Sequence, residues 1–382
     1  MTTYLDNAAT SFPKPEGVYA ALDWFARHTL ANPGRSGHRM AQAAEHAVAD
    51  ARHRLNRFFN GRDPNRFVFT LNATDALNMA FKGVLDAGDH VITTDLEHNS
   101  VSRPLEALVE VGRITLTRIP SDAGGTIDPA DIQGAITSKT RLIALTHASN
   151  VLGTVQPVGD VGRIAREHDL LFLVDAAQTA GVVPIDVQAL CIDLLAIPGH
   201  KSLLGPTGTG ALYVGPRAVV RPWREGGTGG DSLTRTQPTD FPHALEGGTP
   251  NVLGIAGLVA GLDFVESRGV NEIRRHEIEL CDRFRLALAE LPEFRVYGHS
   301  DPGRRVGTVS FGCELISTPD LGGILDTSFD IAVRAGLHCA PYIHRSLGTV
   351  PEGLVRISPG PFTIPADIDR LIDALKNVIG GL

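Results

Sequence analysis

Cysteine is scarce in this sequence of 382 residues, and its four copies lie far apart. They are Cys191, Cys281, Cys313 and Cys339, and no two of them form a CxxC pair. This spacing excludes the paired cysteines of a zinc site and the dense cysteine framework of a small secreted domain. We therefore expect no metal site, and the role of each cysteine depends on its own neighbours.

Long apolar runs and basic runs are also missing. No stretch approaches the roughly 20 apolar residues that a membrane-spanning helix needs. The opening residues, MTTYLDNAATSFPKP, lack the basic and apolar regions of a secretion signal. The net charge is −8, and no segment rich in Lys or Arg marks a face for nucleic acid or anionic lipid. We expect a cytoplasmic protein that binds neither nucleic acid nor membranes.

What the sequence does contain is the composition and rhythm of an α/β protein. Hydrophobic residues make up 43% and charged residues 20%, as in ordinary folded proteins. Residues 41–59 have apolar positions at helical spacing, and from residue 67 to 175 short apolar runs alternate with helical stretches. This alternation predicts βαβ units and a parallel sheet covered on both faces.

The length of the chain and a break in this rhythm predict two domains. A chain of this size exceeds the length at which a single core usually stops growing. Residues 223–251 cluster Gly, Thr and Pro and predict a long loop, which in a compact domain is usually functional. We expect a large domain over residues 15–262 and a smaller α+β domain made of residues 1–14 and 263–382.

Polar residues that follow predicted strands are the first candidates for a site, because ligands bind beyond the carboxyl ends of parallel strands. Ala73 and Thr74 follow RFVFT at a helix start, where free N–H groups favour a phosphate, although Thr74 or Asp75 could be a simple N-cap. His98 follows HVITT and could stack on a ring, shuttle protons or be structural. Asp175 follows LLFLV, where a carboxylate can keep a heteroaromatic nitrogen protonated or only cap a turn.

Lys201 carries the strongest local signal. It ends the segment IPGHK and precedes the glycine-rich GPTGTG and the apolar ALYVG. A lysine between apolar segments loses hydration, which lowers its pKa and makes the neutral amine nucleophilic enough to form a Schiff base. The alternative is a lysine in a surface loop.

Cys339 lies in the segment RAGLHCAP, which predicts an exposed loop. Arg334 and His338 would stabilise its thiolate, and the alternative is an inert thiol. The other cysteines read as small buried hydrophobic residues. Arg356, alone in the apolar run LVRIS, would bind a carboxylate or form an internal ion pair.

Six segments carry a resemblance that runs nearly from end to end of the chain. They are LDNAAT at 5–10, THASNVLG at 146–153, VDAAQ at 174–178, GHK at 199–201, EGGTPN at 246–251 and RAGLHC at 334–339. Together they resemble the class V aminotransferase-fold family of pyridoxal 5′-phosphate (PLP) enzymes, and within it the cysteine desulfurases of the second, sulfur-mobilisation type, which are similar to selenocysteine lyases. The resemblance implies the PLP-dependent transferase fold, an aspartate aminotransferase-like α/β fold of type I with a mostly parallel sheet in the large domain.

The resemblance also implies roles for individual residues. Lys201 would carry PLP and move the Cα proton of the substrate, and Cys339 would receive its sulfur. Contacts to the PLP ring would come from Asp175 at the nitrogen, His98 stacked above, and Gln178 and Asn150 near the phenolic oxygen. The phosphate would be held by Ala73, Thr74 and His200, and by Thr249 of a neighbouring subunit, which implies a homodimer. The substrate carboxylate would be bound by Arg356, Asn150 and Arg334.

The implied activity converts L-cysteine to L-alanine and leaves a persulfide on Cys339 for a sulfur-acceptor protein, as in iron–sulfur cluster assembly. L-selenocysteine is a second possible substrate. The alternatives are another PLP reaction on the same fold, namely that of a selenocysteine lyase, cysteine sulfinate desulfinase, epimerase or aminotransferase. A further alternative is a non-catalytic scaffold for a sulfur carrier, which would be expected to lose Lys201 or Asp175.

Two positions depart from the pattern of the family. Pro198 stands two residues before the His-Lys pair, where relatives usually have a Ser or Thr that donates to the phosphate. Residues 72–74 read Asn-Ala-Thr where many relatives have Gly-Thr-Thr. We therefore expect the phosphate contacts to be redistributed. The segment APYIHRSLGTVPEG after Cys339 also differs from the better-known desulfurases.

Overall fold

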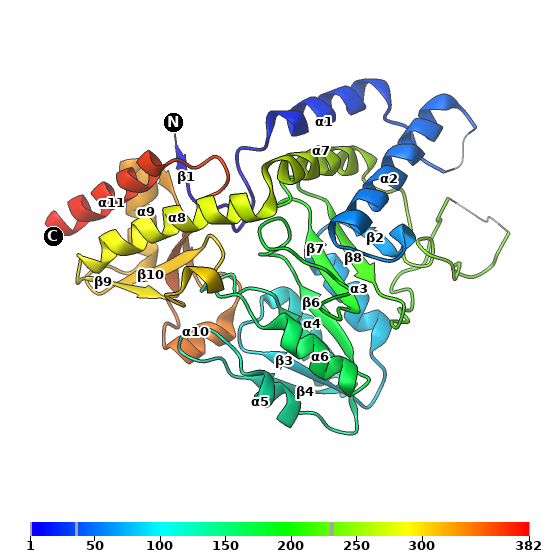
Figure 1. Ribbon diagram of the computed structural model, residues 1–382, viewed down its shortest axis with the longest axis horizontal. Coiled ribbons are helices and arrows are strands. Elements are labelled where there is room, and N and C mark those ends of the chain that lie inside the picture. Colours follow the sequence, from blue (N-terminus) through cyan, green and yellow to red (C-terminus); the bar gives the residue numbers. More distant parts are fainter. Residues whose placement is uncertain (1, 35–36, 230–232, 382) are drawn as a thin grey trace.

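The computed structural model describes residues 2–34, 37–229 and 233–381, and its centre is a twisted sheet of seven strands (Figure 1). Within the described residues only β8 runs antiparallel to its neighbours in this sheet, so the expected mostly parallel sheet is confirmed. The order across the sheet is β2 (Phe67–Thr70), β8 (Gly210–Val214), β7 (Leu194–Pro198), β6 (Leu171–Asp175), β5 (Thr140–Thr146), β3 (Asp89–Thr94) and β4 (Ile114–Ile119).

Both faces of this sheet are buried along β5 to β8, because these strands are apolar at successive positions rather than at alternate ones. Leu142 and Ala144 of β5 face one core, and Ile143 and Leu145 face the other. The first core is covered by α3 (Ala73–Val84) and α4 (Asn99–Glu110). The second is covered by α2 (Arg39–Phe58), α5 (Pro129–Gly134), α6 (Val158–Glu167) and α7 (Val252–Arg268), and α1 (Glu16–His28) packs on α7.

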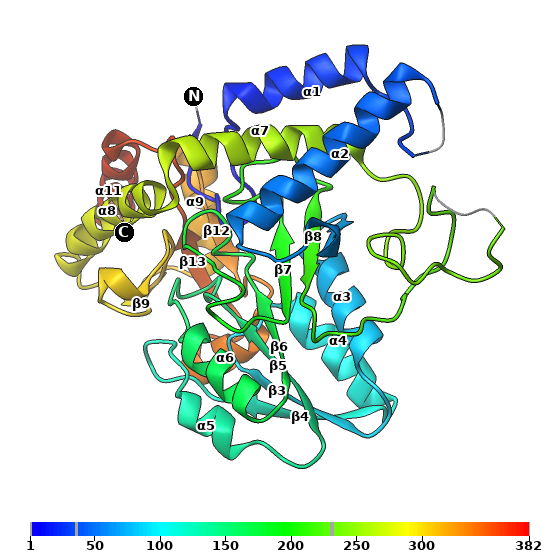
Figure 2. The same cartoon turned by 45° about the vertical axis from the view of Figure 1, so that its right-hand side comes forward.

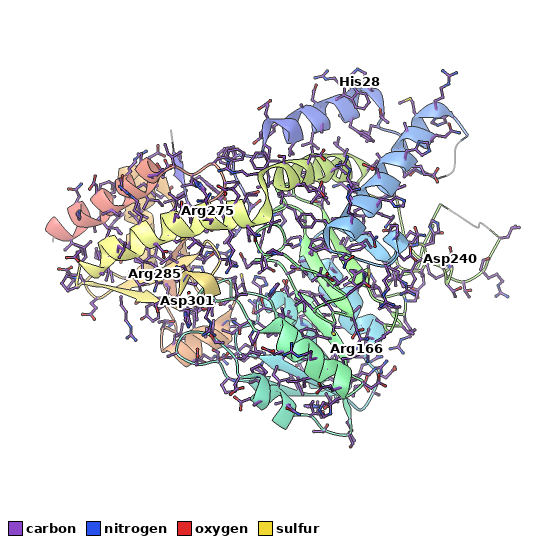
Figure 3. The ribbon with its side chains drawn as sticks, viewed as in Figure 1. His28, Arg166, Asp240, Arg275, Arg285 and Asp301 are labelled. Atoms are coloured by element: carbon purple, nitrogen blue, oxygen red, sulfur yellow. The ribbon has the colours of Figure 1, made fainter. Side chains whose placement is uncertain are left out.

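A smaller α+β part lies beside the large sheet in both views (Figures 1 and 2). Its antiparallel sheet has the order β12 (Arg334–Gly336), β13 (Leu354–Ile357), β10 (Val309–Cys313) and β9 (Phe294–Tyr297). Its helices are α8 (Val270–Ala289), α9 (Thr318–Phe329), α10 (Pro341–Leu347) and α11 (Pro365–Gly380). Short 3₁₀ helices cover Pro64–Arg66 and Pro302–Arg304. Figure 3 places Arg275 and Arg285 in this part, and Arg166 and Asp240 in the larger one.

The N-terminal segment joins the smaller part, as the fold class implies. Strand β1 (Thr3–Tyr4) pairs in parallel with β11 (Ile331–Ala332), and Leu5 is buried in the core that holds Phe284 and Phe311. We propose that the boundary between the two domains lies between residues 262 and 263, within α7. This helix would then belong partly to each domain.

Other sequence predictions can be compared with the observed elements directly. The helix expected over 41–59 is α2. The described residues of the segment 223–251 contain neither helix nor strand, as predicted. The carboxyl ends of β3, β5, β6 and β7 lie at the same edge of the sheet because these strands are parallel neighbours. This edge is therefore the expected place for a site.

Gly181 makes a close packing contact behind this edge, in the turns that follow β6. Its φ is +104°, and an added Cβ would overlap the backbone carbonyl of Ser202, next to Lys201. We predict that Gly181→Ala lowers the free energy of unfolding by about 2 kcal/mol, since it combines backbone strain with overpacking. Urea denaturation measures the change. Gly17→Ala is the control, because Gly17 has open space around it in α1 and should lose no stability. Equal stabilities of the two variants would contradict the prediction.

Candidate active site

A cavity of about 190 Å³ opens at the carboxyl edge of the sheet. Ala9 of the N-terminal segment and Arg334 of β12 also line it, so it lies between the two parts of the chain. It brings together most of the predicted site residues, namely Ala73, Thr74, His98, Asn150, Asp175, Gln178, His200, Lys201 and Arg334. Cys339, Thr249 and Arg356 are not among the residues that line it.

The amine of Lys201 enters the cavity from the turn after β7. Burial lowers the pKa of Lys201 from 10.5 to about 8, while the negative charge of Asp175 acts in the opposite direction. The neutral form of this amine, which is the nucleophile, is therefore far more populated near neutral pH than in an ordinary lysine.

Asp175 ends β6 and is almost completely buried. Its Oδ1 accepts a hydrogen bond of 2.9 Å from the backbone N–H of Ala177, so the carboxylate does cap a turn. Burial raises the pKa of Asp175, whereas this hydrogen bond and the Lys201 charge lower it. The carboxylate also lines the cavity, and its role in holding a heteroaromatic nitrogen stays a prediction.

The start of α3 forms one end of the cavity. Its N-cap is Asn72, whose Oδ1 accepts from the N–H of Asp75 at 2.9 Å, so the alternative that Thr74 or Asp75 is the cap is wrong. Ala73 and Thr74 lie in the first turn, where backbone N–H groups have no helical partner and the helix dipole favours an anion.

Ser100 lines the same end of the cavity, and the sequence reasoning missed it. Its hydroxyl lies 2.7 Å from that of Thr74 and 2.9 Å from Nδ1 of His98. Its position in the first turn of α4, just after His98, was the available signal. Ser100 thus supplies a hydroxyl to the cavity that Ala73 and Pro198, which have none, also line.

The two histidines of the cavity are neutral. Burial lowers the pKa of His98 and the pKa of His200 to about 4 each, and the Lys201 charge adds to both effects. Nδ1 of His98 accepts from the N–H of Ser100, so His98 caps α4 as well as lining the cavity. Nδ1 of His200 lies 3.1 Å from the hydroxyl of Thr10.

The N-terminal segment fastens the backbone around Lys201. The hydroxyl of Ser11 donates to the carbonyl of Lys201 at 3.0 Å, and Nζ of Lys14 donates to the carbonyl of His200 at 2.7 Å. Nε2 of Gln178 donates to the carbonyl of Ala8 at 3.2 Å. The first residues of the chain therefore fix the backbone that carries the amine, which the motif LDNAAT did not indicate on its own.

Arg356 forms the internal ion pair that the sequence left open. Its guanidinium is fully buried, and its Nη2 donates to Oδ1 of Asp6 at 2.6 Å. Its Nη1 donates to the backbone carbonyl of Asn150 at 3.0 Å. Asp6 had not been identified as its partner, because the two residues lie at opposite ends of the sequence. A role of Arg356 in carboxylate binding stays a prediction.

Cys339 lies beside the cavity in an exposed turn after β12. Its Sγ accepts a contact of 3.5 Å from Nη2 of Arg334, a residue that lines the cavity. Its backbone carbonyl accepts from the N–H of Asn99, the residue after His98, at 2.7 Å. Cys339 is thus linked to the smaller part by its thiol and to the larger part by its backbone carbonyl.

Two expectations about the cysteines are wrong. Burial lowers the pKa of His338 to about 2, so this ring is neutral and supplies no positive charge to the Cys339 thiolate. Cys191 and Cys313 are partly exposed, because they lie in a turn and at the end of β10, and only Cys281 among the three predicted hydrophobic cysteines is fully buried. Burial raises the pKa of Cys281.

Thr249 lies in the long loop and lines two other hollows of the surface. One is shared with Gly208 and Asn251, and the larger one, of about 450 Å³, with Arg52 of α2.

Among the described residues, no group of three or more His, Cys, Asp or Glu could hold a metal ion. No helix in the described part of the chain is long and apolar enough to cross a membrane.

Comparison with known proteins places this site in a family. The aminotransferase class-V model matches residues 3–371, so the chain belongs to the class-V aminotransferases. A probable cysteine desulfurase of Halalkalibacterium halodurans is 36% identical over 383 residues, which cover 98% of this chain and 92% of that relative. A cysteine desulfurase of Thermococcus onnurineus, solved in its apo form, has a TM-score of 0.94 and 34% identity over 100% of this chain and 95% of that one.

A second solved relative is the cysteine desulfurase CsdA of Escherichia coli, in its S-sulfonic acid form. It has a TM-score of 0.90 and 30% identity, over 100% of this chain and 95% of that one. Since relatives of this identity extend over nearly the full length, the chain belongs among the cysteine desulfurases of the class-V family.

The ion pair between Asp6 and Arg356 generates a stability prediction. Asp6→Asn leaves a buried guanidinium without its counter-charge, so we expect a loss of about 2 to 3 kcal/mol in the free energy of unfolding. Asp23→Asn removes the partner of Arg27, an exposed pair in α1, and should cost less than about 0.5 kcal/mol. Chemical denaturation of both variants measures the difference, and equal losses would refute the importance of the buried pair.

The lowered pKa of Lys201 generates a prediction about pH. Only the neutral amine forms a Schiff base, so the rate at which PLP combines with the cofactor-free protein should rise with pH through a midpoint near 8. Asp175→Asn should move this midpoint to lower pH, because the carboxylate raises the pKa of Lys201. Stopped-flow absorbance follows the reaction. A midpoint near the ordinary lysine value of 10.5 would show that the amine is not desolvated.

Proposed function

We propose that this chain is a PLP-dependent cysteine desulfurase that converts L-cysteine to L-alanine and takes the sulfur on Cys339. One observation carries the proposal. Arg334 lines the cavity that contains the Lys201 amine, and the same guanidinium contacts Sγ of Cys339 at 3.5 Å. An amine that holds a carbonyl cofactor and a thiol that accepts sulfur therefore serve one cavity.

The residues of the cavity fit PLP. The amine of Lys201 suits its aldehyde, the carboxylate of Asp175 suits its ring nitrogen, and the start of α3 suits its phosphate. When bound, PLP would supply an electron sink for the charge that develops at the substrate Cα. Residues near the ring would be His98, Gln178 and Asn150.

The phosphate contacts would be redistributed in this chain. Pro198 lines the cavity but has no hydroxyl and no N–H to donate. The N–H groups of Ala73 and Thr74 would be joined by His200 and by the hydroxyls of Thr74 and Ser100. The 2.7 Å contact between those two hydroxyls supports a shared role at this end of the cavity.

The reaction would divide between the amine and the thiol. Once displaced by the substrate amine, Lys201 would take the Cα proton, while Arg334 and Arg356 hold the carboxylate with Asn150. The Cys339 thiolate would then attack the substrate sulfur, so that an S–S bond forms and the Cβ–S bond breaks. The electron pair of the Cβ–S bond would stay with Cβ, which would take up a proton, and Lys201 would return the Cα proton, so that L-alanine leaves and the persulfide stays on Cys339. The neutral His98 would limit charge repulsion near the amine.

Two further features concern partners. Thr249 lies outside the cavity of its own chain, which supports a homodimer in which it reaches the phosphate of the neighbouring subunit. The exposure of Cys339 supports delivery of its sulfur to an acceptor protein at the surface. L-selenocysteine remains a second candidate substrate, because the thiolate can attack selenium in the same way.

The proposal predicts the products of the PLP-loaded protein. With L-cysteine and a thiol reductant, alanine and sulfide should form in equal amounts, and Cys339→Ala should abolish sulfide release while keeping the yellow cofactor bound. Cys313→Ala is the matched control, since this partly exposed thiol has no role in the mechanism. Amino-acid analysis and a sulfide assay measure both products. Full activity in Cys339→Ala would overturn the persulfide role, and formation of pyruvate would redirect the assignment to another PLP reaction.

A further inference from the structure

The turn that carries Cys339 has an unusual backbone. His338 and Cys339 are consecutive and both left-handed, with φ of +48° and +59°. The N–H of Ala340 donates to the carbonyl of Leu337 at 2.9 Å and closes the turn around them. Two positive φ values at the central positions are the pattern of a type I′ turn, which Gly and Asn favour. For a cysteine this conformation costs about 1 kcal/mol or more, so neighbouring groups must hold it.

Two hydrogen bonds from the larger part hold this turn. Nδ2 of Asn150 donates to the carbonyl of His338 at 2.8 Å, and the N–H of Asn99 donates to the carbonyl of Cys339 at 2.7 Å. The first comes from the loop after β5 and the second from the start of α4, so each carbonyl of the strained pair is fixed from a different element. The side chains on either side of Cys339, those of His338 and Ala340, are buried.

Of these two donors only that of Asn150 is a side chain, and it is a short and buried one. Asn150 lines the cavity, and its backbone carbonyl accepts from Arg356 at 3.0 Å, which fixes its position. Its amide has a second N–H and a carbonyl oxygen for groups within the cavity. The same side chain therefore faces the place of the substrate and the backbone of the thiol.

We propose that Asn150 is a positioning residue that latches the strained Cys339 turn, so that the thiol is held in place toward the cavity that Asn150 itself lines. This role goes beyond a contact to the cofactor or the substrate, and it rests on the proposed function of Cys339. The latch keeps the nucleophile ordered before any acceptor protein binds.

The test compares two partial reactions in the PLP-loaded protein. Exchange of the Cα proton of L-alanine in D₂O needs Lys201 but not the thiol, whereas sulfide release from L-cysteine needs both. Asn150→Ala should lower sulfide release about 10- to 100-fold more than it lowers Cα exchange, because a misplaced nucleophile loses that much rate. Asn150→Asp should lower sulfide release selectively as well, with almost no change in side-chain volume. Its carboxylate has no N–H to donate to the backbone carbonyl of His338. Asn65→Ala, at an exposed position away from the cavity, is the control.

Amide hydrogen exchange gives a readout that a contact to the ring alone would not change. In both Asn150 variants the amides of Ala340 and Asn99, which donate to or within the turn, should exchange about tenfold faster, as expected for the loss of one hydrogen bond. Replacing His338 by Gly in the Asn150→Ala protein should restore part of the sulfide release, because Gly adopts positive φ without strain.

The outcomes separate the latch from the proposed function. The latch is overturned if Asn150→Asp lowers the rates of Cα exchange and sulfide release equally and the amides of Ala340 and Asn99 exchange no faster. Asn150 would then act only on the cofactor or substrate. If Cys339→Ala still releases sulfide at the full rate, the proposed function fails, whatever the amides do. The latch and the proposed function are both supported if an Asn150 variant keeps a normal thermal midpoint of unfolding, exchanges these amides faster and selectively loses sulfide release.

Discussion

The burial of one amine at the edge of a parallel sheet is the constraint on which the rest of this structure depends. A charged ammonium is costly in that position, so the pKa of Lys201 is lowered to about 8 and the neutral amine becomes accessible. Asp175 supplies a negative charge from the next strand, and the histidines around the amine are neutral. The N-terminal segment then binds the backbone carbonyls of His200 and Lys201.

The second requirement is that a thiol from the smaller part lies beside the cavity of this amine. Three groups make the connection: Arg334 contacts Sγ of Cys339, Asn99 binds its carbonyl, and Asn150 binds the carbonyl before it. The smaller part is fixed in turn by the pairing of β1 with β11 and by the ion pair between Asp6 and Arg356. The chain therefore uses its first residues to join its last strands to the large sheet.

Much of this arrangement could be predicted from the sequence, for physical reasons. Strands buried on both faces appear as apolar runs, and residues just after them must meet at one edge, which is why Asp175, His98 and Lys201 were identified. Contacts between distant segments leave no such local signal. The pairing of Asp6 with Arg356, the hydroxyl of Ser100 beside Thr74, and the burial of His338 each depend on the packing of elements that are far apart in the chain.

The central claim is that sulfur passes from a substrate in the Lys201 cavity to Cys339. The most direct measurement is a brief reaction of the PLP-loaded protein with L-cysteine that carries labelled sulfur, followed by mass mapping of the cysteine peptides. The account predicts that the peptide with Cys339 alone carries the label, that a reductant removes it, and that Lys201→Arg prevents it. Label on the peptide of Cys191 or Cys313, or release of labelled sulfide with none bound to Cys339, would contradict the account.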